Sequence, residues 1–197
     1  MPDDVQRGLR EALKVVAVTL KESDAPFALT GGYALWARGG PEPQHDVDFM
    51  VAEEDAPGVM ARLAEQGLQV VQPPEDWLSK VFVGAGSDAV AEDAPDAAMV
   101  DVLFRSAGVP IERSHFDGAD ELEVESVSMP VLSATTLITD KLNALEEHSC
   151  DFGSVLPAAR AVREQVDWEQ VRSATKANDF AAAFLFLLER LRVVEPG

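Results

Sequence analysis

The sequence has little of several things that would define other classes of protein. Cys150 is the only cysteine in 197 residues, so the chain cannot form an internal disulfide, which fits a reducing compartment. No stretch approaches the roughly 18 consecutive apolar residues that a membrane-spanning helix needs. The first residues, Met-Pro-Asp-Asp, lack the basic and apolar segments of a secretion signal. We therefore expect a cytoplasmic protein without a membrane partner.

Basic residues are also scarce. The chain has 16 Lys and Arg against 35 Asp and Glu, a net charge of −19. Most of the excess lies in residues 1–140, which hold 26 acids and 9 bases, whereas residues 141–197 hold 9 acids and 7 bases. A generic nucleic-acid binder is basic, because it neutralises phosphates. The composition instead suits a metal site, a cationic small substrate or a basic protein partner. If a polyanion binds, we expect it on the C-terminal part.

Several common catalytic motifs are missing as well. The sequence has no Gly-x-x-x-x-Gly-Lys phosphate loop and no Ser-His-Asp elbow. His115 and His148 are too isolated to predict a zinc site, and Cys150 has no cysteine partner. At 47% hydrophobic residues, the chain can still bury a full core. The acidic residues are therefore the main candidates for chemistry.

Apolar periodicity and turn residues predict an α+β fold in two parts. In the first part we expect strands at 27–30, 46–51, 68–71, 80–83 and 99–104, with a weak strand near 122–128. Helices are expected at 3–23, 33–36 and 57–66, and loops at 39–43, 84–98 and 106–121. In the second part, Ser133 can cap a helix that runs to about residue 147, and helices are expected at 151–165, 167–176 and 179–192. This division predicts a first domain, 1–130, and a C-terminal helical domain, 131–197.

The segment Asp46-Val47-Asp48-Phe49 is the first candidate for chemistry. On a strand, residues i and i+2 share a face, so Asp46 and Asp48 point the same way while Val47 and Phe49 point to the core. Neighbouring carboxylates repel unless a cation lies between them, and magnesium prefers oxygen ligands. The pattern therefore favours a metal site. The alternative is an exposed edge strand with two solvated acids.

Two further features accompany this pair of acids. Gly31-Gly32 lies between an expected strand and a helix, where phosphate can approach backbone N–H groups; the alternative is an ordinary turn. Asp101 is the one acid in the apolar run Met99 to Phe104. A buried acid is costly unless it is paired or bound to a metal. Asp101 is therefore a candidate ligand or a salt-bridge partner.

Together these residues resemble the nucleotidyltransferase superfamily in its small, minimal form. Gly31-Gly32 is followed after 13 residues by the pair Asp46 and Asp48, and then by a third acid on a later strand. The resemblance implies a mixed sheet with flanking helices and a nucleoside triphosphate as substrate. It also implies that Asp46, Asp48 and Asp101 hold two Mg²⁺ ions, and that the glycine pair contacts the phosphates.

The segment from Leu132 to Leu145 looks like the helix of AbiEii-type and MenT-type nucleotidyltransferases, which bears a Lys-Leu-x-Ala-Leu sequence. That resemblance gives Lys141 contact with the triphosphate, and gives Asp151, in the next helix, a catalytic or positioning role. Without it, Lys141 reads as a solvated helix lysine. Pro43-Gln44-His45 stands where those relatives carry Arg-x-Thr, and the Lys-Asp pair that often follows their helix is missing. His45 is a candidate for contact with a phosphate or the acceptor, or an ordinary loop residue.

Three functions follow from these expectations. The first is a toxin that adds nucleotides to the 3′ end of tRNA, held by a cognate antitoxin protein. Its RNA track would use bases of the C-terminal helices: Arg160, Arg163, Arg172, Lys176, Arg190 and Arg192. The second is an adenylyltransferase that modifies a cationic antibiotic of the aminoglycoside or lincosamide kind, which the negative field would attract. The third is a degenerate, non-enzymatic nucleotide-binding module.

Overall fold

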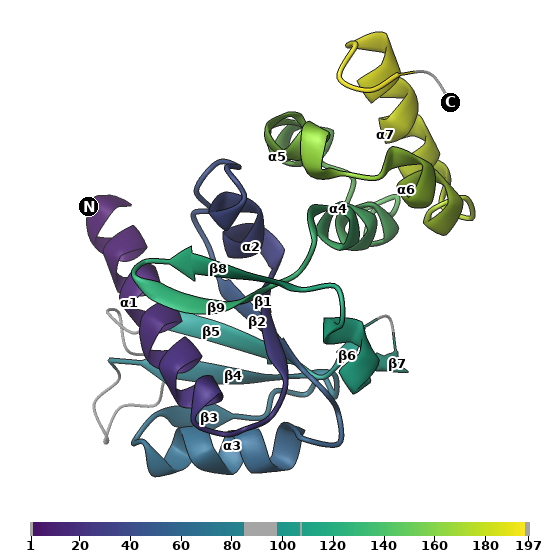
Figure 1. The fold of residues 1–197 in the computed structure, drawn as a ribbon. Helices are drawn as coiled ribbons and strands as arrows, with labels where there is room; N and C mark the ends of the chain where they lie inside the picture. Colours follow the sequence, from purple (N-terminus) through teal and green to yellow (C-terminus); the bar gives the residue numbers. More distant parts are fainter. Residues whose placement is uncertain (1, 85–97, 107, 196–197) are drawn as a thin grey trace.

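The computed structural model describes residues 2–84, 98–106 and 108–195, and its centre is a mixed seven-stranded sheet (Figure 1). The strands lie in the order β3-β4-β5-β2-β1-β9-β8. Their bounds are β1 Phe27–Thr30, β2 Val47–Val51, β3 Gln69–Val71, β4 Leu78–Val83, β5 Ala98–Leu103, β8 Asp120–Val124 and β9 Val127–Val131. Two neighbouring pairs are parallel, β2 with β5 and β1 with β9; the others are antiparallel. The α+β class with a mixed sheet is therefore confirmed.

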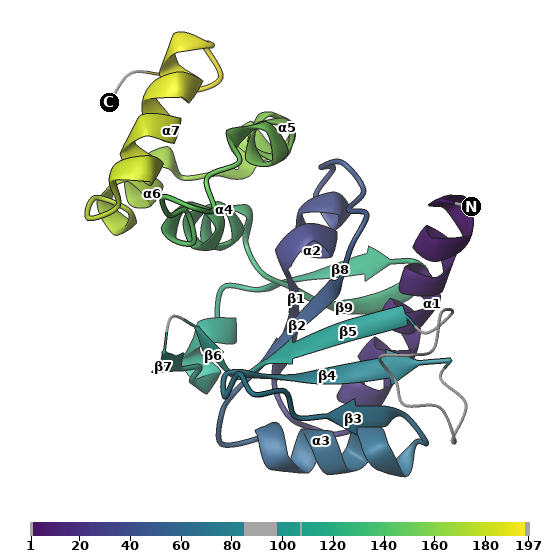
Figure 2. The ribbon, with the colours of Figure 1, turned by 180° about the vertical axis from the view of Figure 1, so that it is seen from behind.

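One face of the sheet is covered by α1 (Pro2–Lys21), while α3 (Ala56–Glu65) packs against α1 and β3 (Figure 1). Strand alternation points Val47 and Phe49 of β2, and Val100 and Val102 of β5, into this core, where all four are fully buried. Figure 2 shows the opposite face, with β5 and β2 in front and α1 behind. The intervening residues of these strands, among them Asp48, point to that open face.

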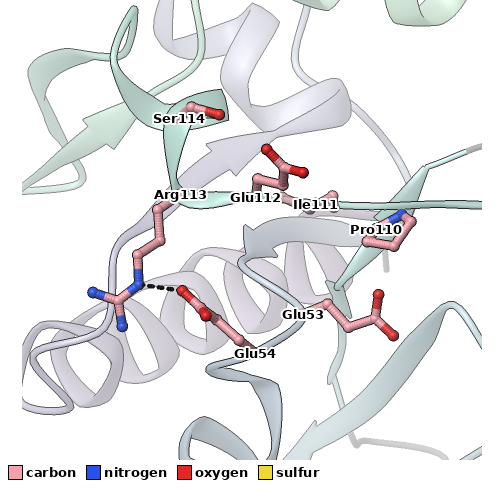
Figure 3. Close-up of a pocket in the computed structure, with 7 residues that line it drawn as sticks. All are labelled: Glu53, Glu54, Pro110, Ile111, Glu112, Arg113 and Ser114. Atoms are coloured by element: carbon pink, nitrogen blue, oxygen red, sulfur yellow. Dashed lines mark hydrogen bonds and ion pairs between the residues drawn. The ribbon is translucent and has the colours of Figure 1, made fainter.

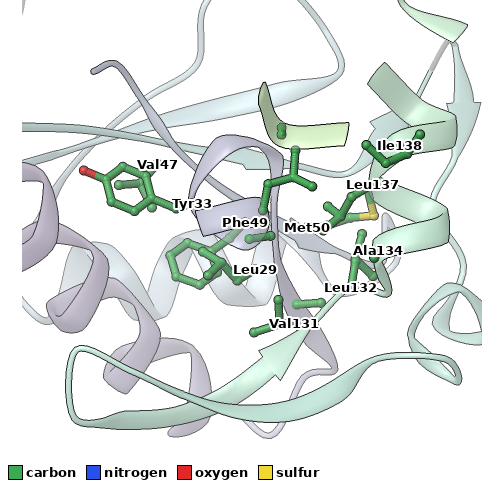
Figure 4. Packing of buried hydrophobic residues seen from close by; sticks show 14 of the residues in the cluster. Leu29, Tyr33, Val47, Phe49, Met50, Val131, Leu132, Ala134, Leu137 and Ile138 are labelled. Carbon is green, nitrogen blue, oxygen red and sulfur yellow. The ribbon is translucent and has the colours of Figure 1, made fainter. Parts of the chain in front are cut away.

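The remaining helices gather at one end of the sheet. They are α2 (Gly31–Ala37), α4 (Ala134–Asn143), α5 (Phe152–Val162), α6 (Trp168–Ala174) and α7 (Asp179–Arg190), with a 3-10 turn at Arg163–Gln165. Helices α4 and α5 pack on α2, and α6 and α7 pack on α4 (Figure 1). The labelled side chains in Figure 4 show apolar residues of β1, β2, β9 and α4 within one continuous core. The sheet and the helical part therefore share a core.

Side-chain caps set the limits of these helices. Ser133 caps α4 as expected, because its hydroxyl accepts from the backbone N–H of Thr136. The helix ends at Asn143 and not near residue 147. The Asn178 side-chain amide donates to the carbonyls of Leu142, Asn143 and Leu145, and thereby satisfies the end of α4. Its carbonyl oxygen caps α7, so one side chain joins two helices.

The segment between β5 and α4 departs most from expectation. The expected loop 106–121 contains the small hairpin β6 (Arg105–Ser106) and β7 (Val109–Pro110) and a 3-10 helix, η2 (Arg113–Phe116). The weak strand near 122–128 is two strands, β8 and β9, joined by a tight turn at Glu125 and Ser126, both at positive φ. No Asn-Gly or Asp-Gly pair marks this turn, which explains why sequence patterns miss it.

Other expectations have simpler outcomes. Most of the loop expected at 84–98, residues 85–97, lies outside the described part of the chain. Strand β9 continues to Val131, one residue past the expected domain boundary, and the division into two domains stays a prediction. Among the helices that the structure describes, none combines the length and apolar character needed to cross a bilayer.

Candidate active site

A row of polar side chains crosses the open face of the sheet. Lys80 of β4 lies opposite Asp101 of β5, Asp101 opposite Asp48 of β2, and Asp48 opposite Thr30 of β1. Residues directly opposite on neighbouring strands point to the same face, so these four side chains are neighbours. The sequence placed Asp48 and Asp101 on separate strands; the sheet brings them side by side. We call these four residues the polar row.

Asp48 is the most perturbed member of the row. Its pKa is raised from 3.8 to about 7, first by burial and then by the charges of Asp101 and Asp46, while Lys141 and a hydrogen bond from the Gly32 N–H act in the opposite direction. Near neutral pH a proton therefore binds the Asp48 carboxylate in part of the molecules, and a metal ion or another cation could neutralise the same charge. A pKa shift of this kind, produced by burial and by other carboxylates, is typical of functional sites.

The glycine pair lies directly against Asp48. Gly31 begins α2 with φ +64°, and a Cβ placed there would overlap the Asp48 carboxylate, 2.8 Å from its Cγ. A Cβ on Gly32 would lie 2.9 Å from the Cβ of Pro43. Both positions therefore exclude side chains, Gly31 by backbone conformation as well as by space. The turn is built around the carboxylate, which an ordinary surface turn does not require.

Asp101 is held by a lysine that the sequence analysis did not select. The Nζ of Lys80 lies 3.4 Å from Oδ1 of Asp101, which is only 9% exposed. Burial raises the pKa of Asp101, and the Lys80 charge partly offsets this. Lys80 is the one charged residue in the apolar strand Leu78–Val83, the same signal that pointed to Asp101. That signal was available in the sequence, but predicting that Lys80 pairs with Asp101 would have required the register of β4 with β5.

Helix α4 brings Lys141 to the polar row, near enough for its charge to lower the pKa of Asp48. The placement of α4 depends on Arg38, at the end of α2, whose side chain is 7% exposed. Its guanidinium donates to the carbonyl of Leu132 at 2.7 Å and of Val131 at 3.0 Å, and pairs with Asp120 at 2.7 Å. Arg38 therefore fixes the chain just before α4 against α2.

The other predicted residues are more exposed. Asp46 lies just before β2 at the surface, near enough to raise the pKa of Asp48 and of Asp101, and His45 is exposed beside it. Asp151 is the exposed N-cap of α5, where its Oδ1 accepts from the Gly153 N–H at 2.9 Å. The structure thus gives Asp151 a capping role and records no contact with the row. In the described part of the chain, no three His, Cys, Asp or Glu side chains are already arranged around a metal position.

Two cavities lie on either side of β7 and Ile111. The larger, about 650 Å³, is an open hollow lined by Glu53, Glu54 and Glu112, with Arg113 bound to Glu54 at 2.7 Å (Figure 3). The smaller, about 220 Å³, lies between β2, the β6–β7 hairpin, η2 and α4. Neither cavity could be predicted from the sequence, because residues from three separate stretches, 50–54, 106–115 and 132–140, form their walls.

The fold is similar to that of solved nucleotidyltransferases. The solution structure of the antibiotic-resistance factor ANT(2'')-Ia aligns with 93% of this chain and 96% of its own, with a TM-score of 0.59 and 15% identity. A crystal structure of ANT(2'')-Ia in complex with adenylyl-2''-tobramycin aligns over 89% and 98%, also at 0.59 and 15%. An antigenic nucleotidyltransferase-like protein from Paracoccidioides brasiliensis aligns over 93% of both chains, with a TM-score of 0.54 and 12% identity.

No protein-family model and no curated protein matches the sequence. At such low identities the structural likeness shows the fold alone: this chain has the nucleotidyltransferase fold along nearly its whole length. The polar row and the Gly31 turn lie on the open face of that fold. The AbiEii-type or MenT-type relationship stays a prediction from the sequence.

Proposed function

We propose that the protein is a magnesium-dependent nucleotidyltransferase, which moves a nucleoside monophosphate from a nucleoside triphosphate to an acceptor hydroxyl. One observation carries this proposal: Asp48 and Asp101 are side by side in the polar row, with the Gly31 turn built against Asp48 and the charge of Lys141 acting on it. A degenerate binding module would have no need of Asp48, whose ionised form is unfavourable, beside the buried Asp101. Carboxylates with such raised pKa values are typical of catalytic sites.

The three carboxylates fit divalent cations by donor type, because magnesium prefers carboxylate oxygens and keeps further positions for phosphate and water. They also fit by charge, since Asp46 and Asp101 raise the pKa of Asp48 and a cation would relieve that repulsion. We propose that Asp46, Asp48 and Asp101 would hold two ions. When bound, such ions neutralise charge on the phosphates and lower the pKa of the acceptor hydroxyl.

The chain's own residues would position the reactants. In the reaction, the acceptor oxygen forms a bond to the α-phosphorus, the bond from that phosphorus to the bridging oxygen breaks, pyrophosphate leaves, and the hydroxyl proton is lost. We propose that Lys141 binds the negatively charged triphosphate and that the turn at Gly31 and Gly32 lets a phosphate approach the backbone closely. Roles for His45 at a phosphate or the acceptor, and for Asp151, stay predictions.

We favour a cationic small molecule as the acceptor. The linings of the two cavities hold four carboxylates and one arginine, and that arginine is already paired with Glu54. A field of this sign attracts cations and repels a nucleic acid. The nearly complete alignment with ANT(2'')-Ia, which was solved with adenylyl-2''-tobramycin, supports the same choice.

The tRNA and antitoxin hypotheses rest on the sequence resemblance. Of the bases expected to form an RNA track, Arg163 pairs with Glu164, and Arg172 pairs with Glu189. Pairing of these two bases reduces the positive charge that an RNA backbone would meet. A tRNA acceptor therefore remains the second outcome of the test below.

The test is transfer of label. The protein is incubated with each α-labelled nucleoside triphosphate, magnesium, and either tobramycin or total tRNA. We expect labelled tobramycin, and loss of transfer by several orders of magnitude in Asp101→Asn, with circular dichroism to confirm folding. Label in tRNA would support the toxin hypothesis instead. Absence of label with every triphosphate and both acceptors would contradict the enzyme assignment for these acceptor classes, and near-normal turnover of Asp101→Asn would contradict the site.

A further inference from the structure

The smaller cavity, of about 220 Å³, shares strand β2 with the polar row. Strand β2 contributes Met50 to its wall, two residues after Asp48 and on the same face of the sheet. Helix α4 contributes Thr136 and Asp140, and the charge of the next residue, Lys141, lowers the pKa of Asp48. The strand that carries Asp48 and the helix that carries Lys141 therefore also form walls of this cavity, so a molecule in it would share these two elements with the proposed reaction centre.

The walls of the cavity are largely apolar, and Asp140 is the one carboxylate among its lining residues. Its side chain is open to solvent within the cavity, yet surrounding protein atoms raise its pKa to about 6, partly offset by His115 across the cavity. Within the described part of the chain, the Asp140 carboxylate has no hydrogen-bond or ion-pair partner. A carboxylate that opens into a largely apolar cavity without such a partner gains by meeting a cation.

The nearby arginines do not supply that partner. Arg105 and Arg113, the arginines next to the β6–β7 hairpin, are bound to Glu53 at 2.6 Å and to Glu54 at 2.7 Å. His115 has its Nδ1 3.0 Å from the backbone nitrogen of Glu112, within the 3-10 turn. The two arginines are therefore engaged by glutamates, His115 keeps only its Nε2 for Asp140, and the acidic hollow beyond β7 adds to the negative field.

We propose that this cavity is the acceptor subsite, and that Asp140 binds an ammonium group of the acceptor there. The inference rests on the proposed nucleotidyl transfer and specifies its acceptor as an amine-bearing polyol. The apolar walls hold the carbon skeleton, and the single carboxylate selects the charge. Since Met50 adjoins Asp48 on the sheet face, an amine fixed at Asp140 leaves a neighbouring hydroxyl to face the polar row.

Equilibrium binding tests the subsite without requiring turnover. Calorimetry at physiological salt measures the Kd of tobramycin, spermidine and fully N-acetylated tobramycin for the wild-type protein, Asp140→Asn, Asp140→Glu and Glu147→Gln. Glu147 is an exposed carboxylate beyond the end of α4 and controls for the loss of one charge. We expect Asp140→Asn to weaken tobramycin binding about tenfold, the size of one charged hydrogen bond. We expect Asp140→Glu to recover part of the affinity and Glu147→Gln to change it less than about twofold.

Three results of the binding experiment would overturn the subsite. Equal loss of affinity in Asp140→Asn and Glu147→Gln would mean that only the overall charge attracts polycations, and would overturn the subsite. So would equal affinity for tobramycin and its acetylated form, or failure of both cationic probes to bind the wild-type protein. The transfer assay separates this inference from the proposed function: transfer to tobramycin that is unaffected by Asp140→Asn overturns the subsite alone. Absence of transfer to any acceptor, with Asp140-dependent binding retained, overturns the function alone.

Discussion

Replacing Asp48 by Asn should stabilise the folded protein while abolishing transfer. The folded-state pKa of Asp48 is about 7 against 3.8 for a free carboxyl, a difference of about three units at about 1.4 kcal/mol each, or about 4 kcal/mol. Because the side chain is only half-buried, water screens part of this, and we expect a gain of about 2 to 3 kcal/mol above about pH 7. Asn is similar in shape and can still accept from the Gly32 N–H.

The sign of the pH dependence follows from linkage. The folded-state pKa lies above the unfolded value, so the penalty of ionising Asp48 is absent below about pH 4, grows as pH rises and is complete above about pH 7. At about pH 5 the gain from Asp48→Asn should therefore fall to less than half. Because the charge of Asp101 contributes to the raised pKa of Asp48, the comparison measures burial and this repulsion together.

Urea unfolding followed by circular dichroism, in EDTA at about pH 5 and about pH 8, gives the two free energies of unfolding. Glu123→Gln, which removes an exposed carboxylate from edge strand β8, is the matched control and should change stability by less than about 0.5 kcal/mol at either pH. Adding magnesium at about pH 8 should stabilise the wild-type protein more than Asp48→Asn. An Asp48→Asn protein that is no more stable than wild type at about pH 8, or equally stabilised at both pH values, would refute the claim of electrostatic strain.

Three further changes test the supports of the site. Gly31→Ala should cost about 2 to 4 kcal/mol in urea unfolding, whereas Gly67→Ala, also at positive φ but with open space around it, should cost about 1 kcal/mol. Lys80→Met leaves the buried Asp101 carboxylate unpaired and should cost about 1 to 3 kcal/mol near neutral pH and less in acid, measured in the same way. Arg38→Met should lower the thermal midpoint and raise the KM for the triphosphate; an unchanged KM would contradict its role in placing α4.

Local patterns in the sequence were sufficient for most elements of the fold. The apolar run from Phe27 to Thr30 is β1, and the three- and four-residue spacing of apolar side chains predicted α1. Elements whose limits depend on distant partners were less predictable. Helix α4 stops at Asn143 because Asn178, 35 residues further on, donates to its last carbonyls. The hairpin of β8 and β9 turns on two non-glycine residues at positive φ, for which the sequence has no clear signal.

The candidate site shows the same division. A lone acid in an apolar strand identified Asp101, and the same rule applied to β4 would have identified Lys80. What the sequence lacks is register: a shift of one residue between β4 and β5 would place Lys80 on the opposite face from Asp101. Asp140 gave no signal at all, because a polar residue on a helix is ordinary until other segments enclose it.

Helix α2 explains how a short element can serve both sides of the site. Its first residue, Gly31, lies against Asp48, so its start is fixed by the polar row. Arg38, at its end, holds the carbonyls of Val131 and Leu132, and its own carbonyl accepts from Gln165. Helix α4 starts from that clamped segment and carries both Lys141, whose charge acts on Asp48, and Asp140 of the smaller cavity. The proposed triphosphate side and acceptor side therefore share one support. Gly31, which has no space for a side chain, and Arg38, whose side chain is buried, fix the two ends of α2. Movement of α2 would therefore change both sides together.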